Sequence, residues 1–137
     1  ALIVHCGPSG HGAMVKLLNN ALAAVNAAAI AEAIDVAETY GLDTDKLIEV
    51  MSAGSAKSTM LELKARPMIE RNYEPLFKLE HMLKDVRHCL TEAHALGKQF
   101  ELAEDAEALY AAADAVGLGE EDFAAVAEVV RQRADAA

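Results

Sequence analysis

One apolar segment between two glycine-containing turns constrains the fold of this chain more than any other feature. The pattern predicts a helix that begins between Ser9 and Gly12 and ends at Gly41, because glycine commonly follows the last residue of a helix. Such a helix has roughly 30 residues and is roughly 45 Å long. Alanines and larger apolar residues occupy nearly all of its faces, so neighbouring helices must cover it. We therefore expect this segment to be the central helix of the domain.

The rest of the chain predicts shorter helices around this one. Hydrophobic residues make up 53% of the sequence and aromatic residues only 4%, a balance that favours packed helices over a sheet. The segment Ala1 to Cys6 is the one stretch with the pattern of a strand. We expect an all-α fold, a multi-helix bundle built around one long central helix, with a break at Pro67. The shorter helices are predicted over residues 44–54, 59–64, 76–96, 101–116 and 120–133.

Charge and cysteine content exclude several classes of function. The chain has 22 acidic and 12 basic residues, a formal net charge of −10, so neither nucleic acid nor an anionic membrane is an expected partner. The apolar run 21–31 is also too short and too rich in alanine for a membrane span. Cys6 and Cys89 form no redox motif and no secretion signal is recognisable, which favours free thiols and a cytoplasmic location. The histidines lack the spacing of a helical zinc site, so no metal is expected.

Three polar residues interrupt the apolar helix near its start. Lys16, Asn19 and Asn20 lie on one side of it, because residues three and four apart are neighbours on a helix surface. One interpretation is a solvated polar patch. The other is a catalytic site, since a positioned ammonium group can deliver a proton to a developing alkoxide and stabilise its charge. We expect Lys16 to be buried beside the apolar surface of the helix.

Two motifs carry a resemblance to a known family. The first is Gly7-Pro8-Ser9-Gly10-His11-Gly12-Ala13 followed by Lys16 and Asn19-Asn20, and the second runs from Phe77 through Lys84-Asp85 to Val86. They resemble the G-x-x-G-x-G…K-x-x-N-N and F-x-L-x-x-x-x-K-D-L segments of the β-hydroxyacid dehydrogenases, with Val86 in place of the usual leucine. That family includes 3-hydroxyisobutyrate dehydrogenase and tartronate semialdehyde reductase. The implied fold is similar to the C-terminal domain of 6-phosphogluconate dehydrogenase.

The resemblance implies a set of site residues. Lys16 corresponds to the family's catalytic lysine, and Asn20 is expected to hold a substrate oxygen, with Asn19 in a supporting role. Phe77 and Asp85 are expected to line the substrate cleft, and Lys84 to contact the nicotinamide cofactor, NAD or NADP. The alternative for these last three is an ordinary solvated helix face. The implied substrate is a small β-hydroxy acid or its semialdehyde.

The resemblance covers only the C-terminal half of such an enzyme. Residues 1–8 are expected to be a terminal strand or linker from a missing nucleotide-binding domain, and residues 9–137 a helical substrate and dimerisation domain. No glycine-rich fingerprint follows a strand in a βαβ unit, so the chain alone is expected to be inactive. A stand-alone helical binding or dimerisation module is the alternative, and an imine reductase is disfavoured by Lys16. The apolar faces of the long helix predict a homodimer or a higher oligomer.

Overall fold

The computed structural model describes residues 1–136, and the regular structure in that range is helical. The prediction of an all-α bundle is therefore confirmed. Side chains are described as far as Arg133. The elements are α1 (His11–Tyr40), α2 (Thr44–Ala53), α3 (Thr59–Glu70), α4 (Leu79–Ala95), α5 (Glu101–Ala115), the 3₁₀ turn η1 (Phe123–Ala125) and α6 (Val126–Ala136).

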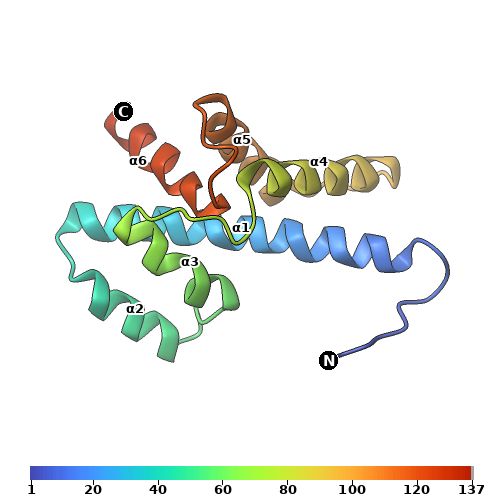
Figure 1. Cartoon of the computed structure of the whole chain (residues 1–137), viewed down its shortest axis with the longest axis horizontal. Coiled ribbons are helices and arrows are strands. Elements are labelled where there is room, and N and C mark those ends of the chain that lie inside the picture. Colours follow the sequence, from blue (N-terminus) through green and yellow to red (C-terminus); the bar gives the residue numbers. More distant parts are fainter. Residues whose placement is uncertain (137) are drawn as a thin grey trace.

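The long helix α1 is the centre of the fold, as the sequence predicted. Its 30 residues lie between Gly10 and Gly41, whose φ angles of 92° and 87° fall in the left-handed region that favours glycine. The N–H group of Gly41 donates to the carbonyl oxygens of Ala37 and Glu38, which ends the helix. In Figure 1, α4, α5 and α6 lie along one side of α1, and α2 and α3 lie along the other.

Small side chains along α1 allow these helices to pack closely. Its buried residues are mostly alanines, and the hydroxyl group of Tyr110 on α5 donates to the carbonyl oxygen of Ala24 at 3.0 Å. By length and hydropathy alone, α1 would also qualify for a membrane crossing, with a mean hydropathy of 1.4 over its most apolar window. Core helices of soluble proteins pass the same test, so these two properties support a membrane span only weakly.

The predicted strand at residues 1–6 is wrong for this structure. The segment has no regular structure, and the side chains of Leu2 and Ile3 are almost fully exposed. A strand is stable only when it pairs with another strand. Within residues 1–136 the sole strand-like pairing is an isolated bridge between Lys78 and Asp122, far along the chain.

Three predicted helix boundaries also differ from the structure. The helix expected from residue 120 begins only at Val126, after the 3₁₀ turn η1 that follows the capping residue Asp122. Helix α3 continues through Pro67 to Glu70, since burying Met68 in the core offsets the one helical hydrogen bond that proline removes. Helix α4 begins at Leu79 instead of 76, because the backbone of residues 76–78 bonds elsewhere. The N–H groups of Leu76 and Phe77 donate to the carboxylate of Asp122, and the carbonyl oxygen of Phe77 accepts from Phe123.

Candidate active site

The first turns of α1 cross α4 at a polar junction, where three predicted site residues meet. The ammonium nitrogen of Lys16 lies 2.9 Å from Oδ2 of Asp85, and Nδ2 of Asn20 donates to the same oxygen at 2.7 Å. Lys16 and Asn20 are four residues apart and so point to the same side of α1. The structure thus brings together Lys16, Asn20 and Asp85, although Asp85 lies 65 or more residues along the chain.

The junction has a buried anion and an exposed cation. The side chain of Asp85 is 8% exposed and that of Lys16 is 59% exposed. Burial by itself raises the pKa of Asp85, but the hydrogen bonds from Lys16 and Asn20 outweigh it, and the pKa of Asp85 falls below its ordinary value. The expected burial of Lys16 is wrong, because its long side chain reaches outward from α1 to the edge of α4. The side chain of Lys16 is thus anchored at its ammonium group by Asp85 and is otherwise largely exposed.

Asn19 supports the junction from the side, in keeping with the role expected for it. Its Nδ2 donates to Oδ1 of Asn20 at 3.3 Å. This bond fixes which end of the Asn20 amide faces Asn19, and therefore directs the amide nitrogen of Asn20 toward Asp85.

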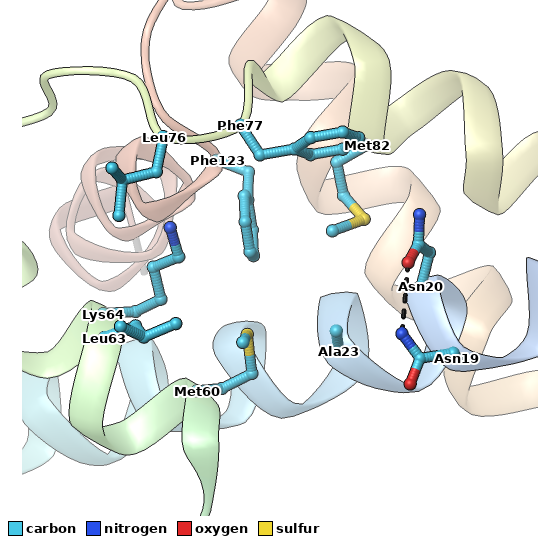
Figure 2. Close-up of a pocket in the computed structure, with 10 residues that line it drawn as sticks. All are labelled: Asn19, Asn20, Ala23, Met60, Leu63, Lys64, Leu76, Phe77, Met82 and Phe123. Carbon is cyan, nitrogen blue, oxygen red and sulfur yellow. Dashed lines mark hydrogen bonds between the residues drawn. The ribbon is translucent and has the colours of Figure 1, made fainter. Parts of the chain in front are cut away.

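A cavity of about 230 Å³ opens beside this junction. Figure 2 shows the two asparagines at one end and Lys64, Leu76 and Phe123 at the other, with Met60 and Met82 pointing in between. Of the predicted site residues, Asn20 and Phe77 line this cavity, whereas Lys16, Lys84 and Asp85 do not. The complete lining is Asn19, Asn20, Ala23, Met60, Leu63, Lys64, Leu76, Phe77, Met82 and Phe123.

Lys84 lies in a different hollow, on the exposed side of α4. This hollow has a volume of about 330 Å³ and also contains Arg87 and His88, with Glu80 and Asp114 at its edges. Arg87 is engaged by Glu107 at 2.7 Å, while Lys84 forms no ion pair with the side chains that the structure describes. Cationic and imidazole donors suit the phosphate and ribose oxygens of a dinucleotide, so Lys84 and His88 fit a cofactor. The structure separates this hollow from the cavity lined by Asn20 and Phe77.

A second lysine–aspartate pair was missed from the sequence. Lys64 on α3 and Asp122 before η1 are both buried, and Nζ of Lys64 lies 2.9 and 3.0 Å from the two carboxylate oxygens. The sequence contains a signal for this pair, because Lys64 shares its helix stripe with Leu61, Ala65 and Met68, which all face the core. A lysine on such a stripe needs a buried partner.

The described residues 1–136 contain no candidate metal centre. No group of three or more His, Cys, Asp or Glu side chains there is arranged to hold an ion. The expectation of no metal remains a prediction from the sequence.

Comparison with known proteins gives the family of this chain. Residues 10–130 match the family model described as the NAD-binding domain of NADP-dependent 3-hydroxyisobutyrate dehydrogenase. The chain is 36% identical to glyoxylate/succinic semialdehyde reductase 2, chloroplastic, from Arabidopsis thaliana over 127 residues, which are 93% of this chain and 36% of that protein.

Two solved structures share the fold. The 3-hydroxyisobutyrate dehydrogenase of Mycobacterium tuberculosis, solved with L-serine, superposes with a TM-score of 0.87 at 29% identity, over 94% of this chain and 46% of that one. The 3-hydroxyisobutyrate dehydrogenase of Salmonella typhimurium superposes with a TM-score of 0.84 at 30% identity, over 88% and 42% of the two chains.

The chain therefore belongs to the 3-hydroxyisobutyrate dehydrogenase family of β-hydroxyacid dehydrogenases, as its two motifs indicated. NAD or NADP is the cofactor of this family, which confirms that part of the prediction. The family model attaches its NAD-binding description to the helical segment itself. The chain spans less than half the length of the curated relatives that it matches.

Proposed function

We propose that this chain is the C-terminal helical domain of an NAD(P)-dependent oxidoreductase that interconverts a small β-hydroxy acid and its semialdehyde. The observation that carries the proposal is the exposed ammonium group of Lys16, held 2.9 Å from the buried carboxylate of Asp85. A catalytic acid must reach its substrate and must also be held in place, and this arrangement meets both requirements. Residues 1–8 would connect this domain to a preceding nucleotide-binding domain.

In the proposed reaction the cofactor supplies hydride to the carbonyl carbon or accepts it from the alcohol. During reduction, Lys16 donates a proton to the alkoxide oxygen that develops on the substrate; during oxidation, its neutral amine takes that proton back. Asp85 keeps the ammonium group oriented toward the open side of the junction. Asn20 uses one N–H of its amide for Asp85, and we propose that the other donates to a substrate oxygen.

Phe77 and Lys84 would complete the two binding regions. Phe77 lines the cavity next to Asn20 and would provide an apolar wall for the substrate. Asp85 would contribute to the same region through its hydrogen bond with Asn20. Lys84 would contact phosphate or ribose oxygens of NAD or NADP from its separate hollow on α4. Substrate and cofactor contacts would then divide between two separate hollows of the domain.

The test is a pair of lysine substitutions in the full-length enzyme. Lys16→Ala should lower kcat at least about 100-fold, the usual scale of lost acid–base catalysis, with little change in the KM for cofactor. Lys84→Ala should do the reverse and mainly raise the KM for cofactor. Lys46→Ala on α2 is the matched control, because Lys46 is also exposed and lies outside both regions. Near-normal kcat in Lys16→Ala at saturating substrate would overturn the catalytic role.

The substrate is best sought among those of the relatives. Their names include glyoxylate, succinic semialdehyde, L-threonate and 3-hydroxyisobutyrate. We propose a comparison of kcat/KM across these four compounds with NAD(H) and NADP(H). No turnover with any of them would favour the alternative, a helical binding or dimerisation module without activity.

We also propose that the isolated chain is inactive and self-associates. Residues 1–137 should show no turnover and only weak affinity for NAD, so binding near 1 μM by calorimetry would contradict the division into two domains. Val15, Leu18 and Leu22 leave an apolar face of α1 exposed, which supports a homodimer or higher oligomer. A strict monomer in sedimentation equilibrium at high micromolar concentration would refute this.

The cytoplasmic location remains a prediction from the sequence. Relatives of this chain include proteins described as chloroplastic and mitochondrial.

A further inference from the structure

The carboxylate of Asp122 accepts five hydrogen bonds. It accepts from Nζ of Lys64 with both oxygens, from the backbone N–H groups of Leu76 and Phe77 at 3.0 and 3.1 Å, and from that of Ala124 at 2.9 Å. These donors belong to three separate segments, namely α3, the loop before α4, and η1. One buried anion therefore joins segments that are up to 58 residues apart in the sequence.

The same three segments form most of the cavity beside the Lys16 junction. Six of its ten lining residues come from them: Met60, Leu63, Lys64, Leu76, Phe77 and Phe123. In Figure 2, Leu63, Lys64 and Leu76 lie at the end of the cavity opposite the two asparagines, and Met60, Phe77 and Phe123 lie between the two ends. The relative positions of α3, the 76–77 loop and η1 therefore set the width of the cavity.

We propose that the Lys64–Asp122 pair is a positioning element for substrate binding, which holds Phe77 and the adjoining cavity wall in the geometry that the substrate needs. The proposal rests on the proposed function, since it assigns the cavity to the substrate. It adds two residues that neither the sequence motifs nor the Lys16 junction includes.

Phe77 is the residue through which the pair acts. Its N–H group donates to Asp122 and its carbonyl oxygen accepts from the N–H group of Phe123 at 3.1 Å, so both of its backbone groups are fixed. Its ring meets the ring of Phe123 edge-on, with the centroids 6.2 Å apart. The ring of Phe123 in turn lies under Nζ of Lys64, 4.2 Å from the centroid. Lys64 and Asp122 thus control the backbone of Phe77 and the surface against which its ring packs.

Lys64 does not act as a substrate-binding cation. Its side chain is 3% exposed, two of its ammonium bonds go to Asp122, and the Phe123 ring covers it. An ammonium group has three donors, so little remains for a ligand. A buried ion pair also adds little net stability relative to an apolar replacement. The contribution of the pair to stability therefore does not explain its presence, whereas positioning of the cavity wall does.

The experiment uses the full-length enzyme with Asp122→Asn and Lys64→Met. We expect each variant to raise the KM for the hydroxy acid at least about 10-fold, with kcat within about 3-fold and the KM for cofactor unchanged, because the wall is displaced while Lys16 is not. Lys64→Met is the milder change, since Asp122 keeps its three backbone donors.

Arg131→Met is the matched control. Arg131 is a mostly buried cation, 11% exposed, which bonds to Glu38, Glu128 and the carbonyl oxygen of Met68, and it does not line the cavity. It should lower the thermal midpoint and leave the KM for the hydroxy acid unchanged. An equal rise of that KM in Arg131→Met would show a general effect of instability and overturn the proposal.

A double-mutant cycle with Phe77→Ala tests whether the Lys64–Asp122 pair affects substrate binding through Phe77. If the pair acts through Phe77, Asp122→Asn should add less than about 2-fold to the KM of an enzyme that already carries Phe77→Ala. Fully multiplicative effects would overturn the proposal, as would an unchanged KM in both single variants. If neither variant folds, as judged by far-UV circular dichroism, the pair is a determinant of overall stability and the proposal also fails.

These outcomes are distinct from failure of the proposed function. That failure would appear as near-normal kcat in Lys16→Ala, whatever the KM values of the Lys64 and Asp122 variants.

Discussion

Two lysine–aspartate pairs in the molecule have the same closest distance and opposite surroundings. In both pairs the closest nitrogen–oxygen distance is 2.9 Å. Lys16 is 59% exposed beside Asp85, whereas Lys64 and Asp122 are 3% and 4% exposed. The distance between the charges therefore does not show what a pair does. Exposure to solvent distinguishes the two pairs, because a proton donor must reach a ligand and a buried lysine cannot reach one.

The difference follows from where each pair lies in the bundle. In Figure 1 the N-terminal turns of α1, which carry Lys16, extend beyond α3 and have α4 on one side. The side chain of Lys16 is accordingly exposed. Lys64 lies on the core-facing stripe of α3, and η1 closes over it.

The largest effect is expected on stability. Asp122→Ala in the chain of residues 1–137 should lower the free energy of unfolding by about 3–5 kcal/mol, because it leaves the buried charge of Lys64 without its partner. Lys16→Ala should cost about 1 kcal/mol or less, because the lost pair has an exposed cation and Asp85 keeps its hydrogen bond from Asn20. Urea unfolding followed by circular dichroism measures both. Similar losses of unfolding free energy in Asp122→Ala and Lys16→Ala would contradict the difference between the buried and the exposed pair.

The next effect concerns activity at the open pair. Asp85→Asn in the full-length enzyme should lower kcat about 10-fold or more, because Lys16 loses the charge that orients it. Asp45→Asn is the control, since Asp45 pairs with Arg66 on the surface between α2 and α3. Steady-state kinetics with saturating substrate and cofactor gives the comparison. Unchanged kcat in Asp85→Asn would show that Lys16 needs no anchor.

A smaller effect is expected from pH. The folded pKa of Asp85 lies below its ordinary value of 3.8, so the stability that Asp85 contributes is fully present above about pH 4 and is lost as the pH falls through the folded pKa. The difference in unfolding free energy between the wild type and Asp85→Asn should therefore be constant from about pH 4 to 8 and shrink below it. A difference that changes between pH 5 and 8 would argue against a depressed pKa.

The smallest effect is expected from salt. Raising the ionic strength to about 1 M shortens the screening length to about 3 Å, which weakens exposed pairs and leaves buried ones nearly unchanged. The stability cost of Lys16→Ala should fall by a few tenths of a kcal/mol, whereas that of Asp122→Ala should persist. Urea unfolding at low and high salt measures both. Equal salt sensitivity would show that water reaches the Lys64–Asp122 pair.

Much of the fold was predictable because its signals are local. The bounds of α1 follow from glycines that adopt left-handed geometry, and the alanine-rich faces of α1 identify it as the core helix. The start of α4 was misplaced by three residues, because the bonds that hold residues 76 and 77 come from Asp122 and Phe123. The strand predicted at residues 1–6 has the right residue types, but its formation depends on a partner strand.

The sequence by itself determined the helical class and the family, and it predicted Lys16, Asn20 and Asp85 as site residues, because each depends on local spacing or on motif residues. Tertiary structure alone decided that Lys16 is exposed, that Lys84 lies in a separate hollow, and that Lys64 meets Asp122. Burial and long-range pairing depend on how helices cross. A helical period fixes which residues share a face, and only packing decides what that face meets.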